Sequence, residues 1–346
     1  MSSFAANLIE SLVAELACRV PAAYPPCQGL VLTGSTARRE ATIARRPERL
    51  VWLSDVELLV VVSDRTNLKG AGRTLDSIAT EIASDLRSRG MLLELELTPA
   101  PERYFRRVRP QLFGYELKAC GRQIFGVRDY LREIPAFHWQ TIPAEESFRL
   151  VSNRIMEWIE YRLVAPRLDL ARQFYVLAKT YLDLLTALTL LTESYAPTYR
   201  ARFENHQRAI ATARDAGCSL PASFERSLEI AFDFKFDPES RFRYLWDGDG
   251  RDLSAALGRN GLSFVCDDLP LAALGVWWWA LSRIARGRVL APDCPPRIHS
   301  LAARLRGWAR LLLHTGVANR LPLVARAARL FPAGSPRSLA YGCAAR

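Results

Sequence analysis

The chain has 346 residues, of which 49% are hydrophobic and 24% are charged. A chain of this length and composition can bury two sizeable cores, which excludes disorder as its general state. Its seven cysteines are scattered, odd in number and without a C-x-x-C pair. This usage argues against a zinc site and predicts reduced thiols in the cytoplasm.

The net charge of +11 is concentrated at the C-terminal end. Residues 283–346 contain twelve arginines and one acid, Asp293, and 12 − 1 = +11 equals the net charge of the whole chain. Such a segment can bind nucleic acid, an anionic membrane or an acidic partner. The alternative is that a chain with only four lysines uses arginine on its solvated helix faces. Both interpretations stay open at the level of the sequence.

Two apolar segments bear on targeting and membranes. Residues 1–19 have apolar side chains at helical spacing but lack the basic start and unbroken apolar core of a signal peptide. The run Leu269–Leu281 is bounded by Asp268 and Arg283, and it is shorter than the about 20 residues of a membrane span. The sequence therefore predicts a buried helix here and no membrane span.

Up to about residue 140, short β-rich runs alternate with helices. Gly29–Thr33 predicts a buried strand, which Gly34-Ser35 turns into the segment 36–44. Residues 50–53 lead to a second strand over 54–62, rich in β-branched residues. A helix follows over 74–89, with Leu75, Ile78, Ile82 and Leu86 on one face.

After this helix, residues 91–97 alternate strictly between apolar residues and glutamates. This pattern predicts a strand with Glu94 and Glu96 on one face, ended by Pro99 and Pro101. A short helix over 115–119 and an edge strand over 122–126 are expected next.

From about residue 147 the pattern is almost wholly helical, which places the domain boundary between 1–140 and 141–346. The predicted fold class is α+β: a small mixed β-sheet domain with flanking helices, followed by an all-α helical domain with an Arg-rich C-terminal part. Helices are expected over 147–163, 168–193, 199–216, 222–233, 269–287 and 297–314.

Asp55 and Glu57 are the residues that point most clearly to chemistry. They lie two apart on the predicted strand, so their side chains share one face. Two carboxylates on one face repel each other unless a cation lies between them, and hard oxygen ligands suit Mg²⁺ or Mn²⁺. Gly34-Ser35 after a strand offers backbone N–H groups and a hydroxyl to a polyphosphate. Each feature alone is common, and their combination carries the argument.

In this order, these residues resemble the DNA polymerase β-like nucleotidyltransferase superfamily. Its signature is a strand, Gly-Ser opening a short helix, and then a strand with Asp-x-(Asp/Glu). The matching segments are Leu32–Arg39 and Leu53–Val61, within a resemblance that covers about residues 28–130. Aspartate followed by glutamate, with a helical domain appended, is most similar to antibiotic nucleotidyltransferases of the kanamycin type.

The chain departs from the family pattern at two places. Arg38 stands where the family commonly has a small residue, three positions after the serine. A basic stretch over 45–49 fills the gap before Asp55, and it either contacts phosphate or is plain surface. Neither departure removes a metal ligand.

The resemblance implies a role for each matching residue. Asp55 and Glu57 are the metal ligands and hold Mg²⁺ or Mn²⁺ on a nucleoside triphosphate, ATP or another. Gly34 and Ser35 contact its phosphates, and Ser54, which often precedes the motif in the family, is counted with the nucleotide-binding residues.

The resemblance also implies a third catalytic acid and a basic residue from the helical domain. Glu94 and Glu96 are the candidates for the acid, and Glu94 is preferred because it lies nearer the middle of its predicted strand. Related enzymes supply a lysine or tyrosine from the first helices of the appended domain. Lys179, which shares a helix face with Arg172 and Tyr175, is the candidate, and a solvated surface lysine is the alternative.

The predicted function is a cytoplasmic, Mg²⁺-dependent transferase that moves a nucleoside monophosphate, AMP from ATP as first choice, to a hydroxyl group and releases pyrophosphate. The acceptor is left open among a small molecule, a protein and an RNA. Two alternatives remain: a catalytically inactive relative that binds a nucleotide or partner protein, and a nucleic-acid-binding protein that acts through the Arg-rich C-terminal part.

Overall fold

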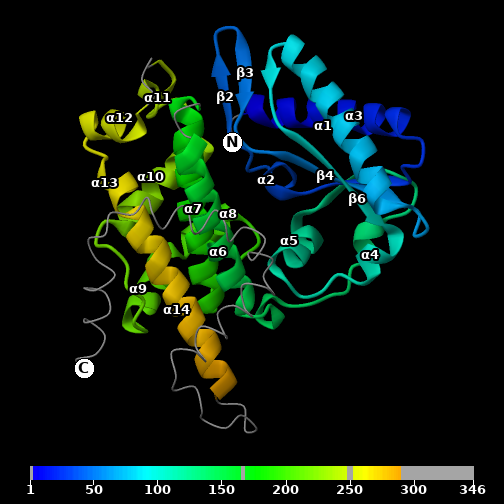
Figure 1. Cartoon of the computed structure of the whole chain (residues 1–346). Helices are drawn as coiled ribbons and strands as arrows, with labels where there is room; N and C mark the ends of the chain where they lie inside the picture. The colour runs from blue at the N-terminus through cyan, green and yellow to red at the C-terminus, as the bar shows by residue number, and fades with distance from the viewer. Residues whose placement is uncertain (1–2, 165–167, 248–251, 290–346) are drawn as a thin grey trace.

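The computed structural model describes residues 3–164, 168–247 and 252–289, which form two adjoining parts (Figure 1). Strands and flanking helices make up the N-terminal part, residues 3–141, and the helical part follows from residue 145. The α+β class predicted from the sequence is confirmed. The predicted boundary at residue 140 falls within η2 (Trp139–Thr141), just before α6 (Glu145–Val164).

A four-stranded sheet in the order β6-β4-β1-β7 is the centre of the N-terminal part. β4 pairs antiparallel with β1 and parallel with β6, whereas β7 pairs antiparallel with β1. The predicted edge strand, β7, does lie at the edge. The strands are β1 (Gly29–Leu32), β4 (Val56–Val62), β6 (Leu95–Pro101) and β7 (Arg122–Phe125).

Both faces of this sheet are covered, which explains the unbroken apolar run of β4. Val56, Leu58 and Val60 pack with the apolar residues of α1 (Ser3–Ala23) and α3 (Leu68–Ser88) on one face. The predicted apolar face of α3 is confirmed, because all four of its residues are buried. The other face is covered by α4 (Glu102–Arg106), α5 (Leu112–Cys120) and η1 (Tyr130–Glu133). The short helix α2 (Gly34–Ala37) lies beside the start of β4.

A second, three-stranded sheet was not anticipated from the sequence. It has the order β2-β3-β5, and its hairpin turns at Pro47-Glu48. The basic stretch over 45–49 is therefore the tip of a hairpin. The strands are β2 (Ile43–Arg46), β3 (Arg49–Trp52) and β5 (Met91–Leu92).

The single strand predicted over 91–97 is wrong, because the chain changes sheets within it. β5 pairs with β3, and after Glu94 the chain enters β6 beside β4. β6 then continues through Pro99 to Pro101. Proline lacks a backbone donor, but β6 is an edge strand, where one side of the backbone needs no partner.

The helical part is arranged around α7, whose residues are almost all buried. The predicted helix over 199–216 is divided at Asn205, and α11 to α13 were not anticipated. The predicted helix over 297–314 lies outside the described residues. The helices are α7 (Leu170–Leu191), α8 (Tyr199–Glu204), α9 (His206–Asp215), α10 (Phe224–Phe236), α11 (Tyr244–Asp247), α12 (Leu253–Arg259), α13 (Phe264–Asp267) and α14 (Leu269–Val289).

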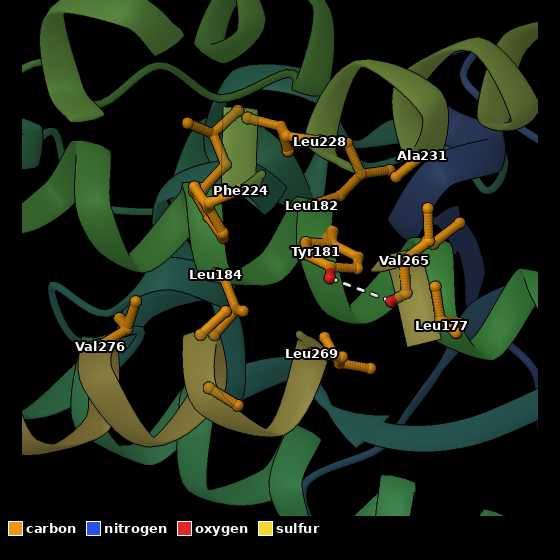
Figure 2. Close-up of a cluster of buried hydrophobic side chains, with 14 of the residues drawn as sticks. Leu177, Tyr181, Leu182, Leu184, Phe224, Leu228, Ala231, Val265, Leu269 and Val276 are labelled. Atoms are coloured by element: carbon orange, nitrogen blue, oxygen red, sulfur yellow. Dashed lines mark hydrogen bonds between the residues drawn. The ribbon is translucent and has the colours of Figure 1, made fainter. Parts of the chain in front are cut away.

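Figure 2 shows the core around α7, where side chains from α10, α13 and α14 surround this helix. Tyr181 is fully buried, and its hydroxyl donates to the carbonyl of Val265 at 3.0 Å, so its polar atom is satisfied inside an apolar core. Val51 and Leu53 of the N-terminal part belong to this same core. Apolar packing therefore joins the two parts directly, close in sequence to Asp55.

Two described helical segments, Leu170–Leu191 and Phe264–Ala285, are long and apolar enough to cross a membrane by length and composition. In the first, 83% of the apolar window is buried inside the protein, and in the second 39%. This is weak evidence for a span, because core helices pass the same test. The second segment is longer than the run over 269–281 on which the prediction of a buried helix rested.

Candidate active site

The turn after β1 places Gly34 against the carboxylate of Glu57. Gly34 has a φ of +65°, a backbone conformation that residues with a side chain rarely adopt. A Cβ atom at this position would overlap Oε2 of Glu57. The hydroxyl of Thr33 donates to the same oxygen at 3.3 Å. Both the backbone conformation and the close approach therefore require glycine here.

Asp55 directly precedes β4, Glu57 is the second residue of the strand, and both side chains are half-buried and line one cavity. Burial raises the pKa of Glu57, and the charges of Asp55 and Glu96 add to this effect. The cations of Lys179 and Arg38 oppose it without reversing it. A further positive charge beside this acid pair, such as a metal ion, would stabilise its ionised form.

One face of α7 contacts the acids, as its spacing predicts. Lys179 places Nζ 3.5 Å from Oδ2 of Asp55. Tyr175, one turn earlier, donates from its hydroxyl to Oγ of Ser54 at 3.1 Å. Arg172 donates to Oε1 of Glu94 at 2.7 Å. The three residues that share a face thus reach three separate residues, namely Asp55, Ser54 and Glu94.

The cavity between the two parts has a volume of about 180 Å³. Gly34 and Ser35 form its wall on the N-terminal part together with the two acids, and Ser35 is half-buried. Tyr175, Lys179 and Lys235 line the opposite wall, on the helical part. Carboxylates on one wall and ammonium groups on the other suit a metal-bound polyanion.

Ser54 lies behind this cavity surface. Ser54 is 1% exposed and is not among the residues that line the cavity. Its Oγ receives hydrogen bonds from the backbone N–H of Thr42 at 2.9 Å, from Tyr175 and from Nζ of Lys235 at 3.1 Å. Ser54, counted from the sequence among the nucleotide-binding residues, therefore links the two walls by hydrogen bonds within the protein.

Sequence reasoning missed Lys235. It lies on α10 among aromatic residues, in the run Phe-Asp-Phe-Lys-Phe over 232–236, which reads as an ordinary helix. Its side chain lines the cavity although the residue is only 4% exposed. The available signal was its rarity, because the chain has only four lysines.

The candidates for the third acid, Glu94 and Glu96, line a groove on the other side of Asp55, which borders both spaces. Both glutamates are exposed. Glu96 is paired with Glu57 across the parallel strands, whereas Glu94 precedes β6 and is held by Arg172. The reason for preferring Glu94, its position in mid-strand, is therefore wrong, and strand register favours Glu96.

Arg38, which departs from the family pattern, is buried in a network of ion pairs. It donates to Glu40 at 3.3 Å and to Glu116 of α5 at 2.5 Å. Arg202 of α8 and the hydroxyl of Tyr195 also donate to Glu116. This arginine is therefore part of the contact between the two parts, and it also forms part of the cavity wall.

The basic hairpin tip contacts the helical part. Arg46 donates to the carbonyl of Trp246 at 3.2 Å and stacks on its ring, with 5.4 Å between the guanidinium carbon and the ring centroid. The backbone of Arg45 donates to Glu239. No residue of 45–49 is among those that line the cavity. These contacts are those of a surface that packs against the helical part.

A second group of possible metal ligands lies on α9 and α10. His206 is near Glu225 and Glu229, and their ligand atoms lie within 4.8 Å of one another. Nδ1 of His206 contacts the carbonyl of Phe203 at 2.5 Å, and its buried Nε2 has no hydrogen-bond partner. Glu229 is exposed, and this group is separate from the cavity-lining residues.

No protein-family model matches the chain, and no curated protein matches it either. Most of the Arg-rich C-terminal part, residues 290–346, lies outside the described residues. The proposed roles therefore depend on the geometry around Asp55 and Glu57.

Proposed function

We propose that this protein is a nucleotidyltransferase that moves a nucleoside monophosphate from a nucleoside triphosphate, ATP as first choice, to a hydroxyl acceptor. The supporting observation is the pair Asp55 and Glu57 at the start of a buried strand, opposite Lys179 across one cavity. Gly34 brings the backbone against the same acids. These features suit a metal-bound triphosphate.

The donor set fits a divalent metal ion. Two half-buried carboxylates lie two residues apart at the start of β4, and burial and mutual repulsion raise the pKa of Glu57. Carboxylate oxygens are preferred ligands of Mg²⁺ and Mn²⁺. When bound, such an ion would neutralise phosphate charge and polarise the α-phosphate.

The protein's own residues would position the reactants. Lys179 is placed to contact the phosphates beside Asp55, while Ser35 and the backbone at Gly34 offer hydrogen-bond donors from the opposite wall. The acceptor hydroxyl would bond to the α-phosphorus as the bond to the leaving pyrophosphate breaks. Glu96 would accept the hydroxyl proton from the groove that borders Asp55.

Label transfer tests this proposal. Wild-type protein, Mg²⁺, α-labelled ATP and a cell extract are expected to give a labelled product and pyrophosphate. Asp55→Asn should lower the rate at least about 1,000-fold, because it removes several kcal/mol of transition-state stabilisation. Asp215→Asn, on an exposed position of α9, is the matched control and should leave the rate unchanged. Equal transfer by both variants would remove the proposed assignment.

A second candidate function is nucleotide binding without transfer. It is favoured by one observation: Glu94 and Glu96 are exposed and are not among the residues lining the cavity with Glu57. Tight, Mg²⁺-dependent nucleotide binding without pyrophosphate release, over a panel of hydroxyl acceptors, would support this alternative.

A further inference from the structure

Lys235 has an unusual environment for a lysine. Its side chain is buried, and its ammonium group donates a hydrogen bond to Ser54, whose hydroxyl is neutral. Within the described part of the chain, no carboxylate forms an ion pair with it. The rings of Tyr175 and Tyr199 lie 5.5 and 5.7 Å from Nζ. A buried ammonium without an acid is costly, so its position calls for an explanation.

The charged groups around Lys235 come from α7 and from the segment just after α2. Burial lowers the pKa of Lys235 to about 7, and the positive charges of Arg38 and Lys179 act in the same direction. The acids that face it, Glu40 and Asp183, oppose this effect. Both acids already have other partners: Glu40 accepts from the backbone of Tyr199 and Arg200, and Asp183 accepts from Arg154 and Tyr199.

Lys179, on the same wall, has a pKa that is shifted in the opposite direction. Burial alone would lower its pKa, but Tyr175, Asp55 and Asp183 outweigh that effect, and its pKa is raised. Lys179 is therefore a permanent cation near neutral pH. Lys235 is the lysine of the cavity whose charge can respond to a ligand.

We propose that Lys235 is the protonatable cation of an anion subsite on the helical wall of the cavity, which takes up a proton as it binds a phosphate group of the nucleoside triphosphate. This inference rests on the proposed function. Binding of an anion beside Nζ supplies the negatively charged partner that Lys235 lacks among the described residues, so the ammonium form becomes the stable one. No covalent bond changes, and the proton comes from the buffer.

Calorimetry in buffers of different ionisation enthalpy tests the proposal through the proton count. The ligand is the non-cleavable α,β-methylene analogue of ATP with Mg²⁺, at about pH 8. The wild type is expected to take up nearly one proton per nucleotide, because a group titrating near 7 is mostly neutral at this pH. Lys235→Met should abolish this uptake and weaken binding by about 10-fold or more.

Two further variants show whether the proton uptake belongs to Lys235 itself or follows from the loss of any positive charge in the cavity. Lys179→Met should weaken binding and keep a smaller uptake, because Lys179 is itself already protonated but its charge helps to lower the pKa of Lys235. Lys235→Arg should bind without uptake, because arginine stays charged at this pH. Thermal unfolding of each variant, compared with the wild type, shows whether the fold is intact.

The outcomes distinguish this inference from the proposed function. If the wild type binds the nucleotide with no proton uptake, or if uptake persists in Lys235→Met, the inference is overturned and the proposed function stands. If the wild type binds no nucleoside triphosphate at all, both are overturned. A Lys235→Arg protein that keeps affinity and loses uptake would support the inference even if Lys235→Met fails to fold.

Discussion

Two glutamates on the cavity wall, Glu116 and Glu57, are both largely removed from water, yet their pKa values move in opposite directions. Burial alone would raise the pKa of Glu116, but Arg38 and Arg202 outweigh it and hold the value below the ordinary one. At Glu57, burial prevails, with Asp55 and Glu96 adding to it. The first acid is saturated with donors, and the second is not.

The two acids therefore differ in role. The carboxylate of Glu116 stabilises the contact between the two parts, whereas the carboxylate of Glu57 has few donors and is free to bind a ligand. Glu116 is fixed by two arginines and Tyr195, and Arg202 and Tyr195 belong to the helical part, so these contacts join the N-terminal and helical parts. Among the described residues, only Thr33 donates to the carboxylate of Glu57, in a long hydrogen bond of 3.3 Å. The comparison predicts that substitutions in the network lower stability, whereas substitutions at the acids of the cavity lower activity.

The largest stability effect is expected at Arg202. Arg202→Met leaves Glu116 buried with one fewer cation, and loss of one partner of a buried pair typically costs about 3–5 kcal/mol. Denaturant unfolding measures this directly. Asp55→Asn, the counterpart in the cavity, should stay within about 1 kcal/mol of the wild type while losing activity. A larger loss of stability for Asp55→Asn than for Arg202→Met would reverse the comparison.

Gly34→Ala should have an intermediate effect on stability and a severe one on activity. A side chain at a positive φ costs about 1–2 kcal/mol, and here the new methyl group also displaces the carboxylate of Glu57. Gly217→Ala is the matched control, since Gly217 has a φ of +85° but open space around its Cβ position. The control should lose stability only. Equal activity in the two variants would mean that the close approach at Gly34 has no role.

The smallest effect is a pH dependence at Glu57. Its raised pKa means that the folded state holds a proton that the unfolded state releases, so this side chain's contribution to stability is lost as pH rises from about 4.5 through the raised value. Glu57→Gln should therefore be more stable than the wild type at about pH 8, and the difference should vanish towards about pH 4. Added Mg²⁺ should stabilise the wild type more than the variant. A constant difference at every pH would contradict this account.

Local patterns were enough to predict the centre of the fold. The β-branched run after Asp55 predicts β4, and the spacing of Leu75, Ile78 and Ile82 predicts the buried face of α3. The same is true of the face of α7 that carries Tyr175 and Lys179. In each case the periodicity of the residues matches the element that buries them.

What the sequence did not predict depends on distant partners. The hairpin over 43–52 carries arginines whose pairing surface is the helical part, about 200 positions later in the chain. Arg38 and Glu116 are separated by 78 positions, and Lys235 lies 181 positions from Ser54. The change of sheets between Leu92 and Leu95 likewise follows from pairing with β3 and β4. No local pattern encodes these contacts.

The central claim is that Asp55 and Glu57 hold a divalent metal ion on a nucleoside triphosphate. The most direct test is a crystal of the wild-type protein grown with Mn²⁺ and the α,β-methylene analogue of ATP, measured by anomalous diffraction. We expect a manganese peak bound by both carboxylates, with the phosphates directed towards Lys179. Manganese or nucleotide bound elsewhere in the protein, with this acid pair empty, would contradict the account.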